Sequence, residues 1–217
     1  MTKKIEIGWD ISHQEFTIND HYYFSILKSK LLDEGALVSE VRLFKDIIKY
    51  DVLILNYPEK PFTKSDTKLV NKFLDKGNKV IACGYYDNED MIADNINSIS
   101  THFGLSLKED GVRDKLNNFK GDDLLIVTSK ILSYDSNIKK VLLPCCSSIT
   151  INGSSAAEFV LTEGSLIAKS KNKTILAAQS CVGNGKFILI GTCVFWDNFA
   201  INRFSNMRFA LNLLLDP

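Results

Sequence analysis

The sequence predicts an α/β protein with a mostly parallel, doubly wound sheet, helices on both faces and a β-rich second half. Two observations lead to this class. In the first half, short apolar runs alternate with segments whose apolar residues recur every three or four positions. After Gly104, short β-like runs separated by turn residues replace this alternation. Strands that alternate with amphipathic helices are typical of parallel sheets, whereas closely spaced strands indicate antiparallel pairing.

The first half is expected to run strand, helix, strand, strand, helix, strand, helix. The expected strands are residues 4–9, 36–41, 51–55 and 79–83. The first helix is expected to have Asn19 as its N-cap and to end at Gly35. The last helix of this half is expected from about Glu89 to Gly104, because its apolar residues form a one-sided stripe.

The segment 51–63 is the clearest strand–loop–helix unit. Its strand ends at Asn56, and the prolines at 58 and 61 cannot continue it because they lack a backbone N–H. Thr63 and Asp66 resemble a capping box that begins the next helix. In an open α/β sheet such a loop lies at the carboxyl end of its strand, where ligands bind.

The second half predicts a partly antiparallel region followed by a last helix that Ser205 can cap. Turn residues such as Asn152-Gly153 and Gly183-Asn184-Gly185 separate its short apolar runs. One of these runs is residues 166–170. We expect a single domain over residues 1–217, with a β-rich elaboration over about 108–173.

The amino-acid composition indicates which partners and which cellular compartment to expect for this protein. Lys+Arg and Asp+Glu both number 26, so the sequence lacks the excess of basic residues that is typical of nucleic-acid-binding proteins. No apolar run is long enough to span a bilayer, so we expect no membrane insertion. The amino-terminal residues lead directly into a strand, which indicates no signal peptide. Five cysteines without paired short spacing favour reduced thiols and a cytoplasmic location.

Four groups of residues resemble the GIFT-type module, which occurs in the N-terminal region of an intraflagellar transport protein and in gliding-motility ABC-transporter auxiliaries. They are Pro58-Glu59-Lys60-Pro61-Phe62-Thr63; Asn95-Ile96-Asn97 with Phe103-Gly104; Glu163-Gly164-Ser165 with Thr174-Ile175-Leu176-Ala177; and Gly185-Lys186 through Gly191-Thr192-Cys193-Val194-Phe195-Trp196-Asp197, with Asn206 beyond. The resemblance implies a flavodoxin-like sheet in the class I glutamine amidotransferase-like superfamily. It also implies a binding or scaffolding role rather than catalysis.

Cys83 is the candidate nucleophile if the protein is an enzyme. It ends a strand and precedes Gly84, and class I amidotransferases place their cysteine at such a strand-to-helix turn. Those enzymes also use a late His-Glu pair, whereas no histidine follows His102 here. His13 could supply the base of a Cys83–His13 dyad in a cysteine-dependent hydrolase or amidotransferase-like enzyme. The alternative is that Cys83 is a buried small hydrophobe, and this interpretation is favoured.

Asp10 and His13 follow the first strand and have two interpretations. They could form the lip of a pocket, or they could belong to a solvated loop at a helix entry, which is the favoured interpretation. A metal site at His13 and His21 would need further ligands, and the nearby carboxylates are Asp10, Glu15 and Asp20. We therefore expect no metal and no cofactor.

Loops that follow the strands bring polar and aromatic residues to one edge. Aromatic rings beside neutral and acidic polar groups suit a sugar or another polyol, although the rings could also simply pack the loops together. The expected ligand-binding residues are Asp10, His13, Asn56, Tyr57, Glu59, Gly84, Tyr85, Thr192, Trp196 and Asp197.

The expected function is a non-catalytic binding or scaffolding module of the cytoplasm. Its expected partner is a protein or a small polar, sugar-like ligand at the carboxyl edge of the sheet, and not nucleic acid. A homodimer through a sheet edge or an exposed helix face is left open.

Overall fold

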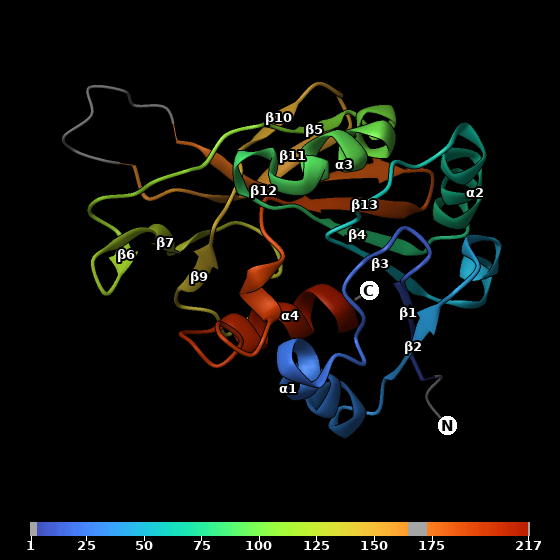
Figure 1. Ribbon diagram of the computed structural model, residues 1–217, viewed down its shortest axis with the longest axis horizontal. Helices are drawn as coiled ribbons and strands as arrows, with labels where there is room; N and C mark the ends of the chain where they lie inside the picture. The colour runs from blue at the N-terminus through green and yellow to red at the C-terminus, as the bar shows by residue number, and fades with distance from the viewer. Residues whose placement is uncertain (1–3, 165–172, 217) are drawn as a thin grey trace.

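A computed structural model describes residues 4–164 and 173–216. Its main feature is an eight-stranded sheet with the strand order β2-β1-β3-β4-β13-β12-β11-β8 (Figure 1). Neighbouring strands pair in parallel from β2 to β13, and in antiparallel fashion from β13 to β8. The prediction of a mixed α/β protein with a mostly parallel sheet and a β-rich second half is confirmed.

The parallel strands are β1 (Glu6–Asp10), β2 (Leu37–Val41), β3 (Val52–Asn56), β4 (Lys79–Cys83) and β13 (Gly185–Ile190). The antiparallel part consists of β8 (Lys130–Ile131), β11 (Ala156–Leu161) and β12 (Ile175–Val182). A two-stranded sheet pairs β5 (Leu105–Leu107) with β10 (Ile149–Ile151). A three-stranded sheet contains β6 (Asn118–Phe119), β7 (Asp122–Thr128) and β9 (Val141–Pro144).

Helices cover both faces of the main sheet (Figure 1). The helices are α1 (His21–Asp33), α2 (Lys64–Asp75), α3 (Ile92–Ser100) and α4 (Asn206–Leu215). Apolar residues of α1 and α4 pack in one core cluster, and those of α2 and α3 pack in another. Strand β3 supplies both clusters, because Ile54 points to the first and Leu53 and Leu55 point to the second.

Four short 3-10 helices connect these elements within residues 4–164 and 173–216. They are η1 (Phe44–Lys49), η2 (Tyr86–Met91), η3 (Thr101–Phe103) and η4 (Val194–Trp196). Of these, η4 follows β13 directly and is buried at Phe195 and Trp196.

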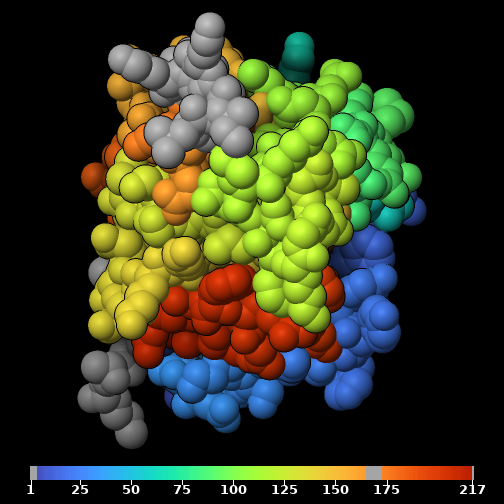
Figure 2. Space-filling model, turned by 90° about the vertical axis from the view of Figure 1, so that its left-hand side faces the viewer, coloured from blue at the N-terminus to red at the C-terminus, as the bar shows by residue number. Residues whose placement is uncertain are grey.

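The β6-β7-β9 region packs on the segment between η4 and α4. Figure 2 shows this face, where the yellow-green and yellow segments lie against the red C-terminal one. Val127, Leu142 and Ala200 form a small core cluster there. The region is therefore joined to the rest of the protein by apolar packing as well as by the chain.

Two predicted helix starts need correction. The N-cap of α1 is Asp20 rather than Asn19, because its Oδ1 accepts from Tyr22 N at 2.9 Å. Helix α3 begins at Ile92 rather than near Glu89, because Glu89 has an extended backbone and Asp90 and Met91 have positive φ angles.

Ser205 is the N-cap residue of α4, as predicted, and its backbone O accepts from Phe209 N at 2.9 Å. Its side chain does not cap the helix, because its Oγ accepts from Lys139 N at 3.3 Å.

The predicted capping box of α2 is present. Thr63 Oγ1 accepts from Asp66 N at 3.2 Å, and Asp66 Oδ2 accepts from Thr63 N at 2.8 Å. The expected run at 166–170, and Ser165 of the GIFT-type motif, lie outside the described residues.

Buried asparagine side chains tie distant backbone segments together. Asn206 is fully buried, and its amide donates to Leu142 O and Phe195 O, both at 2.8 Å. Its Oδ1 accepts from Leu142 N at 2.8 Å. One amide therefore satisfies backbone groups of both β9 and η4 at the start of α4.

Replacing Asn206 by Ala should lower the free energy of unfolding by about 2–4 kcal/mol, because buried backbone groups of Leu142 and Phe195 would lose their partner. Chemical denaturation followed by circular dichroism measures this loss. Asn202→Ala is the control, since Asn202 is exposed, and it should change stability by no more than about 0.5 kcal/mol. Equal effects of the two substitutions would contradict the role given to Asn206.

Candidate functional site

Loops after β1, β3, β4 and β13 meet at the carboxyl edge of the parallel strands, as expected for an open α/β sheet. Tyr57 N, just after β3, donates to Cys83 O at 3.1 Å. Gly84 N, just after β4, donates to Ile190 O at 2.8 Å. Trp196 Nε1 in η4 donates to Asn56 Oδ1 at 3.0 Å, which joins the loop after β13 to the end of β3.

A cavity of about 170 Å³, which we call the edge cavity, opens between these loops. Its lining residues are Phe16, Tyr23, Phe24, Asn56, Tyr57, Tyr85, Glu89, Cys193, Val194 and Asp197. The rings of Phe16 and Tyr57 lie 5.3 Å apart between centroids, and those of Tyr57 and Tyr85 lie 5.4 Å apart. Aromatic rings therefore form a continuous part of its wall.

Asn56 is the buried polar group of the edge cavity. It is fully buried, and its Oδ1 is occupied by Trp196 Nε1. Its Nδ2 has no hydrogen-bond partner. A buried amide donor without a partner costs roughly 1–3 kcal/mol, so it is a group that a ligand could satisfy.

Asp197 adds an acidic group to the same wall. Burial raises the pKa of this carboxyl to about 6, although hydrogen bonds from Ala200 N and Phe199 N act in the opposite direction. The pKa of Tyr57 is raised mainly by burial, and the hydrogen bond that its hydroxyl donates to Asp90 at 2.7 Å raises it further. Burial also raises the pKa of Tyr85. Both phenols are therefore neutral at physiological pH.

The structure divides the predicted ligand-binding residues into groups. Asn56, Tyr57, Tyr85 and Asp197 all line the edge cavity. Asp10 and His13 belong to a separate polar cluster, described below. Trp196 is fully buried and stacks on Phe195, with its ring centroid 4.6 Å away, so it supports the cavity rather than lining it.

The remaining predicted residues take part in packing or in hydrogen bonds within the protein. Thr192 is buried and its hydroxyl donates to Pro144 O. A Cβ at Gly84 would lie 2.3 Å from Leu107 Cδ2, so close packing accounts for this glycine. Glu59 is exposed, and its backbone N–H donates to His13 O at 3.0 Å.

Sequence reasoning missed several residues of the cavity wall. Phe16 comes from the segment between β1 and α1, and Tyr23 from the first turn of α1. Cys193 precedes η4, and Val194 is its first residue. The aromatic residues at 16 and 23 are a signal that could have been used, since they follow the first strand. No sequence pattern indicates that Val194 lines a cavity.

Cys83 is a core residue. Its side chain is fully buried, and burial, followed by the neighbouring Cys193, raises the pKa of its thiol. The ring nitrogens of His13 face carboxylates, with Nδ1 2.7 Å from Asp10 Oδ2 and Nε2 3.7 Å from Asp66 Oδ2. These surroundings favour the interpretation of Cys83 as a small hydrophobe and give no support to a Cys83–His13 dyad.

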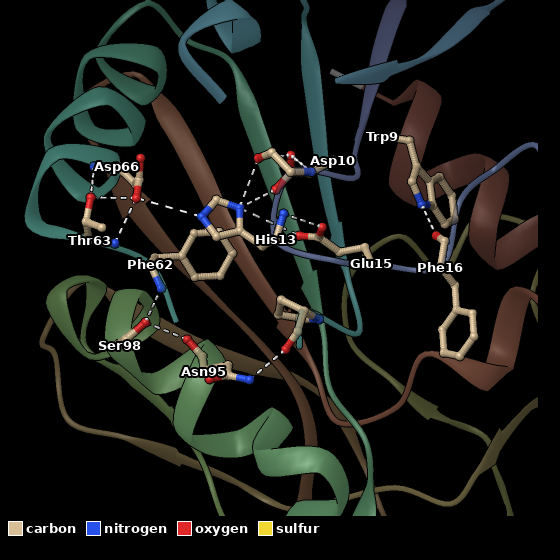
Figure 3. Close-up of polar contacts among 12 residues, drawn as sticks. Trp9, Asp10, His13, Glu15, Phe16, Phe62, Thr63, Asp66, Asn95 and Ser98 are labelled. Carbon is tan, nitrogen blue, oxygen red and sulfur yellow. Dashed lines mark hydrogen bonds and ion pairs between the residues drawn. The ribbon is translucent and has the colours of Figure 1, made fainter. Parts of the chain in front are cut away.

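Asp10, His13 and Glu15 form a buried group, which we call the carboxylate–histidine cluster (Figure 3). The expectation that Asp10 and His13 lie in a solvated loop is wrong, because their exposed fractions are 0% and 8%. Two aromatic rings enclose the imidazole: Phe62 at 4.0 Å and Phe44 at 4.9 Å between ring centroids. The loop after β1 folds inward instead of extending into solvent.

The loop 58–63, which carries the Pro-Glu-Lys-Pro-Phe-Thr motif, is anchored on α3 (Figure 3). Asn95 Nδ2 donates to Pro58 O at 3.0 Å, and Phe62 N donates to Ser98 Oγ at 2.8 Å. The motif therefore holds Phe62 against His13, and its Thr63 begins α2.

The structure can now be compared with known proteins. No family model matches the sequence. A protein of Aquifex aeolicus (strain VF5), described as uncharacterized, is 43% identical over 221 residues, which cover 97% of this chain and 93% of that protein. The chain belongs to the same family as this Aquifex protein.

Solved structures show the fold more widely. The N-terminal domain of mmIFT52 matches with a TM-score of 0.78 and 18% identity, covering 94% of this chain and 93% of that domain. A cytoplasmic protein of Salmonella typhimurium matches with a TM-score of 0.54 and 9% identity, covering 97% of each chain. A ThuA-like protein from Bacteroides uniformis has a TM-score of 0.53 at 12% identity, over 97% of this chain and 89% of that one.

The match to the mmIFT52 domain supports the GIFT-like fold that the motifs indicate. At this level of identity it concerns the fold alone. Among the described residues, no helix has both the length and the apolar character needed to cross a membrane.

Asp197 should give the stability of the protein a measurable pH dependence. Its pKa in the folded state is raised from 3.8 to about 6, so folded Asp197 binds a proton more tightly than unfolded Asp197. The contribution of this group to the free energy of unfolding therefore falls as the pH rises from about 4 to about 6.

Asp197→Asn should remove that decline. Relative to wild type, the variant should gain on the order of 1 kcal/mol between pH 4 and pH 7, a modest figure because water partly screens this group. Urea denaturation across this pH range is the measurement. Parallel pH curves for the two proteins would show that Asp197 does not titrate as described.

Proposed function

We propose that the protein is a non-catalytic binding module whose edge cavity takes a small polar ring compound, of the size and chemistry of a monosaccharide. The observation that carries the proposal is the buried Asn56 Nδ2, which has no hydrogen-bond partner at a cavity walled by aromatic rings. A cavity of about 150 Å³ is enough to hold a six-membered ring. The edge cavity, at about 170 Å³, is of that size.

The lining offers the groups that a polyol needs. Asn56 Nδ2 is a donor for a ligand oxygen, and the carboxyl groups of Asp197 and Glu89 are acceptors for ligand hydroxyls. Tyr57 and Tyr85 present ring surface to the apolar face of a sugar. A few placed polar groups within an aromatic wall are typical of small-molecule sites.

The absence of a catalytic role is part of the proposal. Buried Cys83 lacks the thiolate character that a nucleophile needs, since burial raises its pKa. The His13 ring nitrogens face Asp10 and Asp66. The GIFT-type resemblance also implies binding or scaffolding, so a protein partner at this edge is the alternative occupant.

We further infer the superfamily of the fold, the domain organisation of the chain and the compartment of the protein. The order β2-β1-β3-β4-β13 supports a flavodoxin-like, doubly wound core in the amidotransferase-like superfamily. A single domain over 1–217, with an elaboration over about 108–173, is supported by β8 and β11, which extend the main sheet. All five cysteines lie among the described residues as free thiols, which supports a reducing compartment such as the cytoplasm.

Saturation-transfer NMR with a panel of monosaccharides and polyols tests the ligand, and calorimetry then measures its affinity. Tyr85→Ala should weaken binding at least about 5-fold, because a stacked aromatic ring contributes roughly 1 kcal/mol or more. Tyr22→Ala is the matched control, since Tyr22 is 78% exposed on α1 outside the cavity, and should leave the affinity unchanged. An equal loss of affinity in both variants, or no binding across the panel, would contradict the small-ligand proposal.

Thiol alkylation in the native state distinguishes the binding module from a cysteine-dependent enzyme. Iodoacetamide at neutral pH should modify exposed Cys181 and leave buried Cys83 unmodified until the protein unfolds. Peptide mass spectrometry reads both sites in one experiment, so Cys181 is an internal control. Fast labelling of Cys83 that slows in His13→Ala would establish the rival function.

A further inference from the structure

The carboxylate–histidine cluster brings three potential metal ligands together. One ligand atom each from Asp10, His13 and Glu15 can be chosen so that all lie within 4.8 Å of one another. Asp10 is the last residue of β1, and the other two lie in the loop that follows. Figure 3 shows the three side chains converging beside Phe62.

The outer atoms of the cluster are held in place by hydrogen bonds. Asp10 Oδ1 accepts from Ser12 N at 3.1 Å and from Ser12 Oγ at 2.8 Å. Glu15 Oε2 accepts from His13 N at 2.9 Å. His13 Nδ1 lies 2.7 Å from Asp10 Oδ2, 3.2 Å from Ser12 Oγ and 3.9 Å from Glu15 Oε1, so it faces both carboxyl groups.

Glu15 Oε1 has no hydrogen-bond partner. The Glu15 side chain is 0% exposed, and Oε1 lies 3.9 Å from His13 Nδ1. A buried carboxyl oxygen without a hydrogen bond is costly, and such an atom in a native protein calls for an explanation. A bound cation would give this oxygen a partner, and this argument does not depend on the residue types in the cluster.

The charge balance points the same way. Among the described residues, the cationic group within ion-pair distance of Asp10 and Glu15 is the His13 imidazole. Its Nε2 faces a third carboxylate, Asp66 Oδ2, at 3.7 Å. Three carboxyl groups therefore face one imidazole, which is a set of oxygen and nitrogen atoms that a divalent cation would bind.

We propose that Asp10, His13 and Glu15 bind one divalent first-row transition metal ion, of the Zn²⁺ or Mn²⁺ type. Imidazole nitrogen with two carboxylate oxygens suits these ions better than Mg²⁺ or Ca²⁺, which favour oxygen ligands throughout. His13 would bind the ion through Nδ1, the nitrogen that faces the two carboxylates. The site is independent of the ligand proposed for the edge cavity.

The surroundings of His13 fit a metal ligand. A ligating histidine commonly has its second nitrogen oriented by a carboxylate, and Asp66 occupies that position at Nε2. Asp66 is itself fixed by Thr63 N at 2.8 Å in the capping box of α2.

Calorimetry on the full chain, stripped with EDTA and dialysed, tests the proposal with Zn²⁺ and Mn²⁺, and with Mg²⁺ for comparison. We expect one equivalent of Zn²⁺ or Mn²⁺ per chain, with a Kd on the order of 10 µM or tighter, and at least 10-fold weaker binding of Mg²⁺. The melting temperature should rise by about 5–10 °C when free metal is near 100 times its Kd.

Glu15→Gln is the decisive variant. It keeps the shape of the side chain and removes its charge, so the metal-free variant should fold and be at least as stable as wild type, while its metal affinity falls at least 10-fold. Glu109→Gln, at an exposed carboxylate, is the matched control and should bind as wild type does. All zinc titrations use a Cys181→Ser background, because exposed Cys181 could bind zinc by itself.

Circular dichroism establishes that each variant is folded. His13→Asn serves as a second variant that removes the nitrogen ligand, so the test does not depend on Glu15→Gln alone. A wild-type chain that binds neither Zn²⁺ nor Mn²⁺ at 100 times the expected Kd would overturn the proposal. Folded variants that bind metal as tightly as wild type would also overturn it.

Discussion

The parallel pairing of β4 with β13 is the interaction on which the rest of the architecture depends. It joins residues about a hundred positions apart, in a register from Lys79 opposite Lys186 to Cys83 opposite Ile190. Through this pairing the antiparallel strands β12, β11 and β8 become part of the same sheet as the parallel strands. The pairing also places the loop after β13, with η4, beside the loops after β3 and β4.

Glycines at both ends of β13 allow the strand to pack closely against its neighbours without a steric clash. A Cβ at Gly185 would lie 2.4 Å from Asn78 O, and one at Gly191, just after the strand, would lie 2.0 Å from Ser147 O. A side chain at either position would push the strand away from its neighbours. Both glycines belong to the GIFT-type motif, which here has a packing role rather than a chemical one.

Side-chain amides perform a related task at the carboxyl edge. Asn56 binds Trp196, Asn95 binds Pro58 O, and Asn97 pairs with both backbone groups of Leu107. Each bond satisfies a polar group where strands end and loops turn, which helices and sheets leave unpaired. The loops of this edge are therefore held by specific hydrogen bonds, and Asn56 Nδ2 stands out because it lacks one.

The edge cavity and the carboxylate–histidine cluster share one short segment of chain. Glu15 belongs to the cluster, and the next residue, Phe16, lines the cavity. Trp9 Nε1 donates to Phe16 O at 2.7 Å and holds this segment against β1. The cluster and one wall of the cavity are therefore built from the same stretch of chain.

The sequence by itself determined the class of the fold and the order of its elements. Apolar periodicity, proline and glycine positions and the Thr63–Asp66 pair act over a few residues, so they can be interpreted without the rest of the chain. The same local signals located Asn56, Tyr57, Tyr85 and Asp197 in loops after strands, and the structure places all four around the edge cavity. Their common edge followed from the parallel strand order.

Only the tertiary structure decided burial within those loops. Asp10 and His13 follow a strand in a polar segment, which favours solvent exposure, yet Phe44 and Phe62 from later segments enclose the imidazole. Trp196 and Cys83 occupy similar positions after or at the end of strands, yet packing around both leaves them fully buried. These outcomes depend on contacts between residues far apart in the chain, and no local pattern encodes which side chains will cover which.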